Sequence, residues 1–254
     1  MTEVKPIIVP GPDAPAGACS DCPIRERAVC AHVGEGELAE LESMKFYRSF
    51  AAGQAVVWAG DPLDFVASVV SGVAALTQTL DDGRTQMVGL LLPSDFLGRP
   101  DRGRAPYTVT AVGDTVLCCF RRRPFRELMT RSPQVAGRLL EMTLDELDAA
   151  REWLLLLGRK SAREKIASLL VILARREAAL RKTLPGGQMR LDLPLTREAM
   201  ADYLGLTLET VSRQISALRR DGVIVLEGSR HVLVPDFAAL VAESGDDADG
   251  GVLT

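Results

Sequence analysis

A long helical pattern divides the chain into two regions of different character. Between residues 132 and 158, apolar and small side chains recur at alternating spacings of four and three. They are Ala136, Leu140, Thr143, Leu147, Ala150, Leu154 and Leu157. This is the a/d pattern of a coiled coil, sustained over about three heptads. We therefore expect a dimerisation helix over residues 132–158; the alternative is a helix that packs only on its own domain.

The region before this helix has the pattern of short strands. Runs of β-branched and small apolar residues alternate with glycines, and Asp82-Gly83 is a strong hairpin-turn signal. The expected strands are Ala55–Trp58, Phe65–Val70, Val73–Thr79, Thr85–Leu92, Tyr107–Val112 and Thr115–Phe120. A short acidic helix over 34–43 precedes them. We predict an antiparallel β-roll domain over residues 34–131.

The region after the long helix has the pattern of a winged helix-turn-helix. An amphipathic helix over 162–182 is followed by two short helices, Thr196–Tyr203 and Thr207–Arg220, each with a threonine at its N-cap. Gly205 permits the tight turn between them. Two short strands, Val223–Leu226 and His231–Val234, would form the wing. We assign residues 159–254 to this domain, and the whole chain to the α+β class.

The net charge of −4 conceals an asymmetry. From residue 158 to 234 there are fourteen Lys/Arg and eight Asp/Glu, a balance of +6, so the rest of the chain sums to −10. A basic segment on an acidic protein indicates a polyanionic partner. The second short helix presents Glu209, Ser212 and Arg213 near its start, where a recognition helix contacts base edges in the major groove. The alternative is a set of solvated side chains on an ordinary surface helix.

Three of the five cysteines lie close together near the N-terminus, as Cys19-x2-Cys22-x7-Cys30. The other two are the adjacent pair Cys118-Cys119. A clustered trio with a distant partner is typical of a metal centre, and soft thiolate ligands suit both iron–sulfur clusters and zinc. Buried or incidental cysteines are the alternative. His32, two places past Cys30, is either a substitute ligand or an uninvolved surface histidine. Residues 1–33 are predicted to comprise a disordered arm over 1–18 and then the cysteine loop.

Several classes of protein are disfavoured by the sequence. There is no run of about eighteen apolar residues that could span a membrane, and the N-terminus lacks the features of a secretory signal. We therefore expect a cytoplasmic protein, in which thiols stay reduced and metal ligation is favoured over disulfides. The chain has two histidines, no glycine-rich phosphate loop and no catalytic triad. An enzyme, or an iron–sulfur electron carrier, is therefore not expected.

The segment LTREAMADYLGLTLETVSRQISALRRDGVI closely resembles the helix-turn-helix signature of the CRP/FNR superfamily of bacterial transcription regulators. The order of β-roll, long helix and winged helix-turn-helix is also similar. The cysteine arm narrows the resemblance to the FNR branch, oxygen-responsive regulators that bind a 4Fe–4S cluster. The resemblance implies that Cys19, Cys22, Cys30 and Cys118 are the cluster ligands. Strand alternation would turn Cys119 to the opposite face.

The resemblance also implies partners and roles. Glu209, Ser212 and Arg213 match the family's base-reading triplet, and the implied complex is a homodimer on a pseudo-palindromic operator, in contact with RNA polymerase. Such regulators activate or repress genes for low-oxygen metabolism, according to promoter position. One departure is the spacing of seven residues between Cys22 and Cys30, where the best-known FNR arrangement has five.

Two related alternatives stay open at this point. A relative that senses haem or nitric oxide would not need the arm cysteines, and a zinc-stabilised DNA-binding module would use them for a different metal. Cyclic AMP is not the expected signal, because the phosphate-gripping Arg-Ser pair of the cyclic-nucleotide branch is replaced by Ala105-Pro106, with Arg104 just outside. The preceding Gly-Glu-Leu of that branch is replaced by Ser94-Asp95-Phe96.

Overall fold

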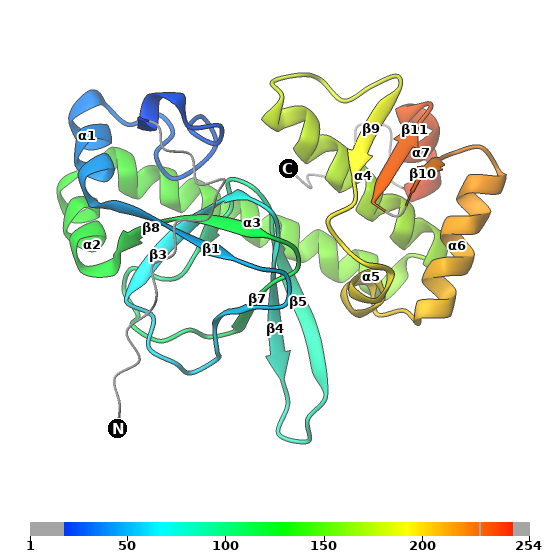
Figure 1. Cartoon of the computed structure of the whole chain (residues 1–254), viewed down its shortest axis with the longest axis horizontal. Helices are drawn as coiled ribbons and strands as arrows, with labels where there is room; N and C mark the ends of the chain where they lie inside the picture. Colours follow the sequence, from blue (N-terminus) through cyan, green and yellow to red (C-terminus); the bar gives the residue numbers. More distant parts are fainter. Residues whose placement is uncertain (1–17, 229, 246–254) are drawn as a thin grey trace. The chain divides into compact units, whose positions relative to one another are not determined.

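The computed structural model describes residues 18–228 and 230–245, and its fold is the expected α+β arrangement (Figure 1). The chain forms two compact units, residues 1–142 and 143–254. The boundary between them falls within the long helix α3 (Pro133–Arg159). Among the described residues, no helix is both long enough and apolar enough to cross a membrane.

The first unit contains a β-roll built from two four-stranded antiparallel sheets. Their strand orders are β1-β8-β3-β6 and β2-β7-β4-β5. The strands are β1 (Lys45–Phe50), β2 (Ala55–Val57), β3 (Phe65–Ser71), β4 (Ala74–Thr79), β5 (Thr85–Leu91), β6 (Phe96–Leu97), β7 (Thr108–Ala111) and β8 (Thr115–Arg121). The six strands expected from the sequence are confirmed, and Gly83 makes the β4–β5 turn with a φ of 86°. Strands β1 and β6 were not expected.

The core of the roll lies between the two sheets. It takes alternate residues from the strands, because successive side chains of a strand point to opposite faces. On β3 these are Phe65, Ala67 and Val69, and on β8 they are Leu117 and Cys119. The residues between them, such as Cys118, face the other side of the sheet.

Two helices accompany the roll. Helix α1 (Glu35–Met44) matches the acidic helix expected over 34–43, whereas α2 (Arg122–Arg131) was not expected. The apolar residues of α2 are few, but Phe125 is fully buried, with its ring 5.6 Å from that of Phe120 and 5.7 Å from that of Phe96. Such aromatic contacts stabilise a short helix against a sheet.

The described part of the second unit contains the second half of α3, four further helices and a small sheet. Helix α4 (Ala162–Leu180) begins at a capping box formed by Ser161 and Glu164. It is followed by α5 (Arg197–Leu204), α6 (Leu208–Arg220) and α7 (Phe237–Ser244). The wing has the order β10-β11-β9, with β10 (Val225–Glu227), β11 (His231–Val234) and the unexpected third strand β9 (Met189–Asp192). Arg163 of α4 pairs with Glu243 at 2.6 Å and with Asp221 at 2.8 Å, which ties α7 and the end of α6 to α4.

Ser94 is a strained position in the roll, and its replacement should raise stability. It has a φ of 84°, which is costly for a residue with a Cβ, and its buried hydroxyl has no hydrogen-bond partner. Ser94→Gly removes both penalties, and the greater freedom of glycine in the unfolded chain offsets part of the gain. We expect the free energy of unfolding to rise by about 1 kcal/mol, measured by urea denaturation.

Ser94→Ala is the matched control, because it removes the buried hydroxyl but keeps the left-handed strain. It should stabilise less than Ser94→Gly. A glycine variant that unfolds at lower urea than the wild-type protein would contradict the strain argument.

Candidate cysteine site and DNA-reading helix

The cysteine segment is an ordered loop in the described part of the chain. A short 3-10 helix, η1 (Cys19–Asp21), leads into successive turns in which the Arg25 amide donates to the Cys22 carbonyl at 3.0 Å. The loop buries its own apolar side chains: Ile24, Ala28, Val29, Ala31 and Val33. Figure 1 shows it, in dark blue, beside α1. The disordered arm was predicted over residues 1–18, of which 1–17 lie outside the described part.

Cys118 and Cys119 point to opposite faces of β8. Cys119 is fully buried in the core of the roll. Burial raises its pKa to about 12; the charged groups that act on it are Arg48, which lowers the pKa, and Asp64, which raises it. No arm cysteine is among these groups. The core therefore holds Cys119 away from the cysteine loop.

Cys118 lies on the face toward the arm cysteines. Its cross-strand neighbours are Tyr47 on β1 and Ser68 on β3. Burial raises the pKa of Cys118, and the thiols that raise it further are the adjacent Cys119 and the arm residues Cys22, Cys19 and Cys30. Mutual electrostatic influence of this kind requires proximity. The structure thus brings the three arm cysteines together with Cys118.

The cysteine loop is fastened to two helices. The backbone N–H of Cys19 donates to Glu42 Oε1 of α1 at 3.2 Å. From α3, Arg138 donates to the carbonyl of Arg27 at 2.6 Å and to that of Ala28 at 3.4 Å. The loop therefore contacts both the helix before the roll and the start of the long helix.

Within the loop, Arg25 contacts Cys30 through both its side chain and its backbone. Its guanidinium donates to the Cys30 carbonyl, and its own carbonyl lies 3.9 Å from Cys30 Sγ. Burial raises the pKa of Cys30 to about 11, while the charge of Arg25 lowers it. At neutral pH this thiol keeps its proton unless a bound cation displaces it.

The donor set suits an iron–sulfur cluster. The thiols of Cys19, Cys22 and Cys30 all act electrostatically on Cys118, and four thiolates are the ligand set of a 4Fe–4S centre. In the described residues no three His, Cys, Asp or Glu side chains are close enough to share one metal ion. A cluster does not require that geometry, because each cysteine binds a different iron. His32 is exposed, with a φ of 59°.

The segment that corresponds to a cyclic-nucleotide phosphate site is apolar and internally bonded. Ala105 is buried, and the guanidinium of Arg104 donates to the Gly60 carbonyl at 2.6 Å. Asp95, in the preceding turn, accepts a hydrogen bond from the Leu92 amide at 2.8 Å. Both polar side chains thus have local structural partners.

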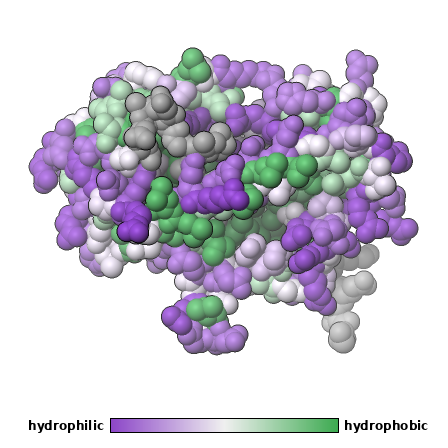
Figure 2. All heavy atoms as spheres, turned by 180° about the vertical axis from the view of Figure 1, so that it is seen from behind, coloured by the Kyte–Doolittle hydropathy of each residue, from purple (hydrophilic) through white to green (hydrophobic). Residues whose placement is uncertain are grey.

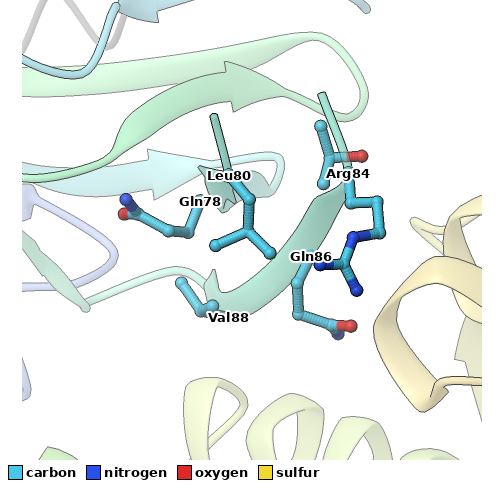
Figure 3. A pocket seen from close by; sticks show the side chains of 6 residues that line it. Gln78, Leu80, Arg84, Gln86 and Val88 are labelled. Carbon is cyan, nitrogen blue, oxygen red and sulfur yellow. The ribbon is translucent and has the colours of Figure 1, made fainter. Parts of the chain in front are cut away.

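The roll also has a shallow pocket of about 340 Å³ on the β4–β5 hairpin (Figure 3). It is lined by Gln78, Leu80, Arg84, Thr85, Gln86 and Val88. Arg84 pairs with Asp82 at 2.8 Å, so its charge is already balanced. The pocket contains no nucleophile and no acid–base pair.

The helix-turn-helix forms as the sequence predicted. The hydroxyl of Thr196 caps α5 by accepting from the Ala199 amide at 3.1 Å, and that of Thr207 caps α6 by accepting from the Thr210 amide at 3.2 Å. Gly205 ends α5 with a φ of 62°, a left-handed conformation that glycine adopts without strain. The turn is therefore fixed by caps at both ends.

Helix α6 separates a buried face from an exposed one. Val211, Ile215 and Leu218 are buried, whereas the predicted triplet Glu209, Ser212 and Arg213 is exposed. This leaves the triplet free to contact a partner.

Glu209 and Arg213 are independent of each other in the DNA-free structure. Hydrogen bonds from its own backbone N–H and from the Thr207 hydroxyl hold the pKa of Glu209 below its usual value. No ion pair joins Glu209 to Arg213 within the described ranges. Both side chains are thus available to base edges.

An aromatic stack joins α3 to the first helix of the helix-turn-helix. The ring of Trp153, in the second half of α3, lies 3.9 Å from that of Tyr203 in α5, with the two planes inclined by 18°. On the other side, Lys165 of α4 donates to the Leu204 carbonyl at 3.3 Å. Sequence reasoning missed Trp153, because no pattern separates it from the apolar run that follows it.

Sequence models of two families match this chain. The cyclic nucleotide-binding domain matches residues 47–132, and the Crp-like helix-turn-helix domain matches residues 164–243. These matches coincide with the roll and with the helix-turn-helix described above.

Relatives with curated names match over nearly the whole chain. The transcriptional activator protein FnrL of Cereibacter sphaeroides is 69% identical over 234 residues, which is 92% of this chain and 94% of that protein. The nitrogen fixation regulation protein FixK of Bradyrhizobium diazoefficiens is 39% identical, over 85% of this chain and 90% of its own length.

The solved structure of FixK2 from Bradyrhizobium japonicum has the same fold. It superposes with a TM-score of 0.70 at 31% identity, over 80% of this chain and 99% of that one. The relatives are regulators rather than enzymes, in agreement with the prediction from the sequence.

Arg213 should read a base pair rather than hold a phosphate. Arginine makes a bidentate contact to guanine O6 and N7, so Arg213→Ala should cost about 1–3 kcal/mol at a specific site and relax the preference at one base pair. A binding assay over operator variants measures this effect.

Arg230, on the wing, is the matched control. Its loss should weaken binding to all sequences alike and lower the salt slope by about one, as expected for a phosphate contact. If Arg213→Ala also weakens matched and mismatched sites equally, Arg213 is a phosphate contact instead.

Proposed function

The chain belongs to the CRP/FNR superfamily of transcription regulators, and we propose that it senses dioxygen through a 4Fe–4S cluster bound by Cys19, Cys22, Cys30 and Cys118. The observation that carries this proposal is the separation of the two β8 cysteines. One is committed to the core of the roll, and the other faces the three arm thiols. The similarity to FnrL, a transcriptional activator, supports the same reading of the chain.

The bound cluster would supply a dioxygen-sensitive link between the arm and the roll. The chain's own residues would convert that link into a change at α3. Arg138 holds two carbonyls of the cysteine loop, so an ordered loop favours one position of the helix start. When the loop is released, these hydrogen bonds are lost. Such linkage couples a local site to a distant equilibrium.

The affected equilibrium would be dimerisation through α3. The helix buries Val135, Trp153 and Leu156, but it exposes a line of leucines: Leu140, Leu144, Leu147, Leu154 and Leu155. Figure 2 shows hydrophobic side chains on the face of the molecule that is turned away in Figure 1. Exposed apolar surface is typical of an interaction site. Leu140, Leu147 and Leu154 recur at the a/d spacing of a coiled coil, which favours a second copy of the same helix.

The complete proposal is a cytoplasmic homodimer on double-stranded DNA. Each copy would place Glu209, Ser212 and Arg213 in one half-site of a pseudo-palindromic operator. From there the protein would contact RNA polymerase and activate or repress genes for low-oxygen metabolism.

Protein purified without air should be brown. Sulfur-to-iron charge transfer in a thiolate-held cluster should give a broad absorbance near about 400 nm, and air should bleach it. A colourless protein that contains stoichiometric zinc would overturn the oxygen-sensor proposal in favour of a zinc-stabilised module.

Single cysteine variants test the ligand set. Replacement of Cys19, Cys22, Cys30 or Cys118 by serine should abolish the absorbance, because each removes one of four ligands. Cys119→Ser is the matched control on the neighbouring position and should keep the colour. The reverse result for Cys118 and Cys119 would show that the ligand is the core-facing cysteine.

The exposed leucines of α3 should form the dimer contact. Leu147→Glu would bury two like charges at a symmetric interface, which should weaken association by several kcal/mol, of the order of 3. Sedimentation should then show a monomer even when the cluster is intact. Leu80→Glu, at a similarly exposed leucine on the β4–β5 hairpin, should remain a dimer. A full dimer of Leu147→Glu would exclude α3 as the interface.

A further inference from the structure

We propose that Lys45 is a positioning residue of the cysteine site, whose ammonium group donates a hydrogen bond to the sulfur of Cys19 and thereby slows the reaction of the bound cluster with dioxygen. This inference rests on the proposed function, since it assumes that Cys19 is a cluster ligand. It adds a residue outside the ligand set that would set the oxygen level at which the protein responds.

Lys45, Glu42 and Cys19 are linked to one another by three hydrogen bonds. Its Nζ lies 3.3 Å from Cys19 Sγ and 3.3 Å from Glu42 Oε1. The same Glu42 oxygen accepts the backbone N–H of Cys19 at 3.2 Å. The position of the sulfur is therefore fixed relative to the cation by two independent routes.

The Lys45 side chain is largely shielded from solvent. It is 12% exposed, and its Nζ lies 5.8 Å from the centre of the Tyr47 ring. Tyr47 is in turn the cross-strand neighbour of Cys118, the fourth proposed ligand. A lysine ammonium carries a positive charge at physiological pH, because its ordinary pKa lies well above that range.

Arg25 is another basic side chain of the cysteine site, but its guanidinium donates to the Cys30 carbonyl rather than to a sulfur. Of the basic side chains in the described cysteine site, Lys45 is the one that donates a hydrogen bond to a thiol sulfur.

Second-sphere hydrogen bonds and local charge set the potential of iron–sulfur centres. When dioxygen takes one electron from the site it becomes superoxide, and the site loses one negative charge. A fixed positive charge at hydrogen-bond distance repels the more positive oxidised site and so makes the oxidation less favourable. The repulsion is strong because the charge is partly buried, where the dielectric constant is low. Removal of the ammonium should therefore accelerate oxidation.

The test uses the full-length protein, purified without air, and two measurements: the rate of bleaching at a fixed dioxygen concentration, and the midpoint potential of the bound cluster. Lys45→Met should bleach about tenfold faster, the order expected for loss of one charge-assisted hydrogen bond, and its potential should fall. Lys45→Arg keeps the charge and the donor and should stay close to the wild-type protein. Lys45→Gln keeps a donor without the charge and should lie between them.

Arg131→Met is the matched control. Arg131 pairs with Glu40 of α1, so its loss also removes a basic residue that anchors this helix, but it has no contact with a cysteine among those described. It should bleach at the wild-type rate. If Lys45→Met does not take up a cluster, Lys45→Gln provides the same comparison.

The two proposals fail in different ways. If Lys45→Met and Lys45→Gln both bleach at the wild-type rate with an unchanged potential, the role of Lys45 is wrong and the oxygen-sensor proposal is untouched. If the wild-type protein itself is colourless, the proposed function is wrong and the inference about Lys45 falls with it. An equal acceleration in Arg131→Met would show that the effect comes from loosening α1, which also overturns the role of Lys45.

Discussion

The alternation of side chains along β8 is the constraint on which the rest of this structure depends. One face of the strand closes the core of the roll with Leu117 and Cys119, and the other carries Cys118 toward the arm. A shift of register by one residue would exchange the two faces, so that Cys118 would enter the core and Cys119 would face the arm. The packing that stabilises the roll therefore decides which thiol faces the arm cysteines. Under the proposed function, this one strand would set both the stability of the roll and the choice of the fourth ligand.

The cysteine loop is stabilised in turn by contacts with neighbouring helices. Its fold is a series of short turns, and short turns have little stability in isolation. Glu42 and Arg138 supply hydrogen bonds from two helices, and Arg138 donates to two backbone carbonyls of the loop. An iron–sulfur cluster would add four bonds to this arrangement. The order of the loop thus combines the apolar packing of its own residues with a few polar contacts to neighbouring helices.

The helix-turn-helix and the β4–β5 hairpin turn were predictable from the sequence because their signals are local. Thr196, Thr207 and Gly205 mark the ends of α5 and α6 through caps and a left-handed turn, and the structure has each of them. Strand β1 was missed because its residues, KFYRSF, do not alternate and follow directly on a helix. The contact of Lys45 with Cys19 joins residues 26 apart and has no local signal. The position of Cys118 relative to the arm depends on the register of three strands, which the sequence indicates only through its resemblance to a family.

The stack of Trp153 on Tyr203 has a practical consequence. The chain has two tryptophans, and the other, Trp58, is 61% exposed on the roll. The buried indole reports from the second unit and the exposed one from the first, so an external quencher extinguishes their emission to different extents. When the emission of Trp58 is quenched, tryptophan fluorescence can therefore follow rearrangement beside the helix-turn-helix in the unlabelled protein.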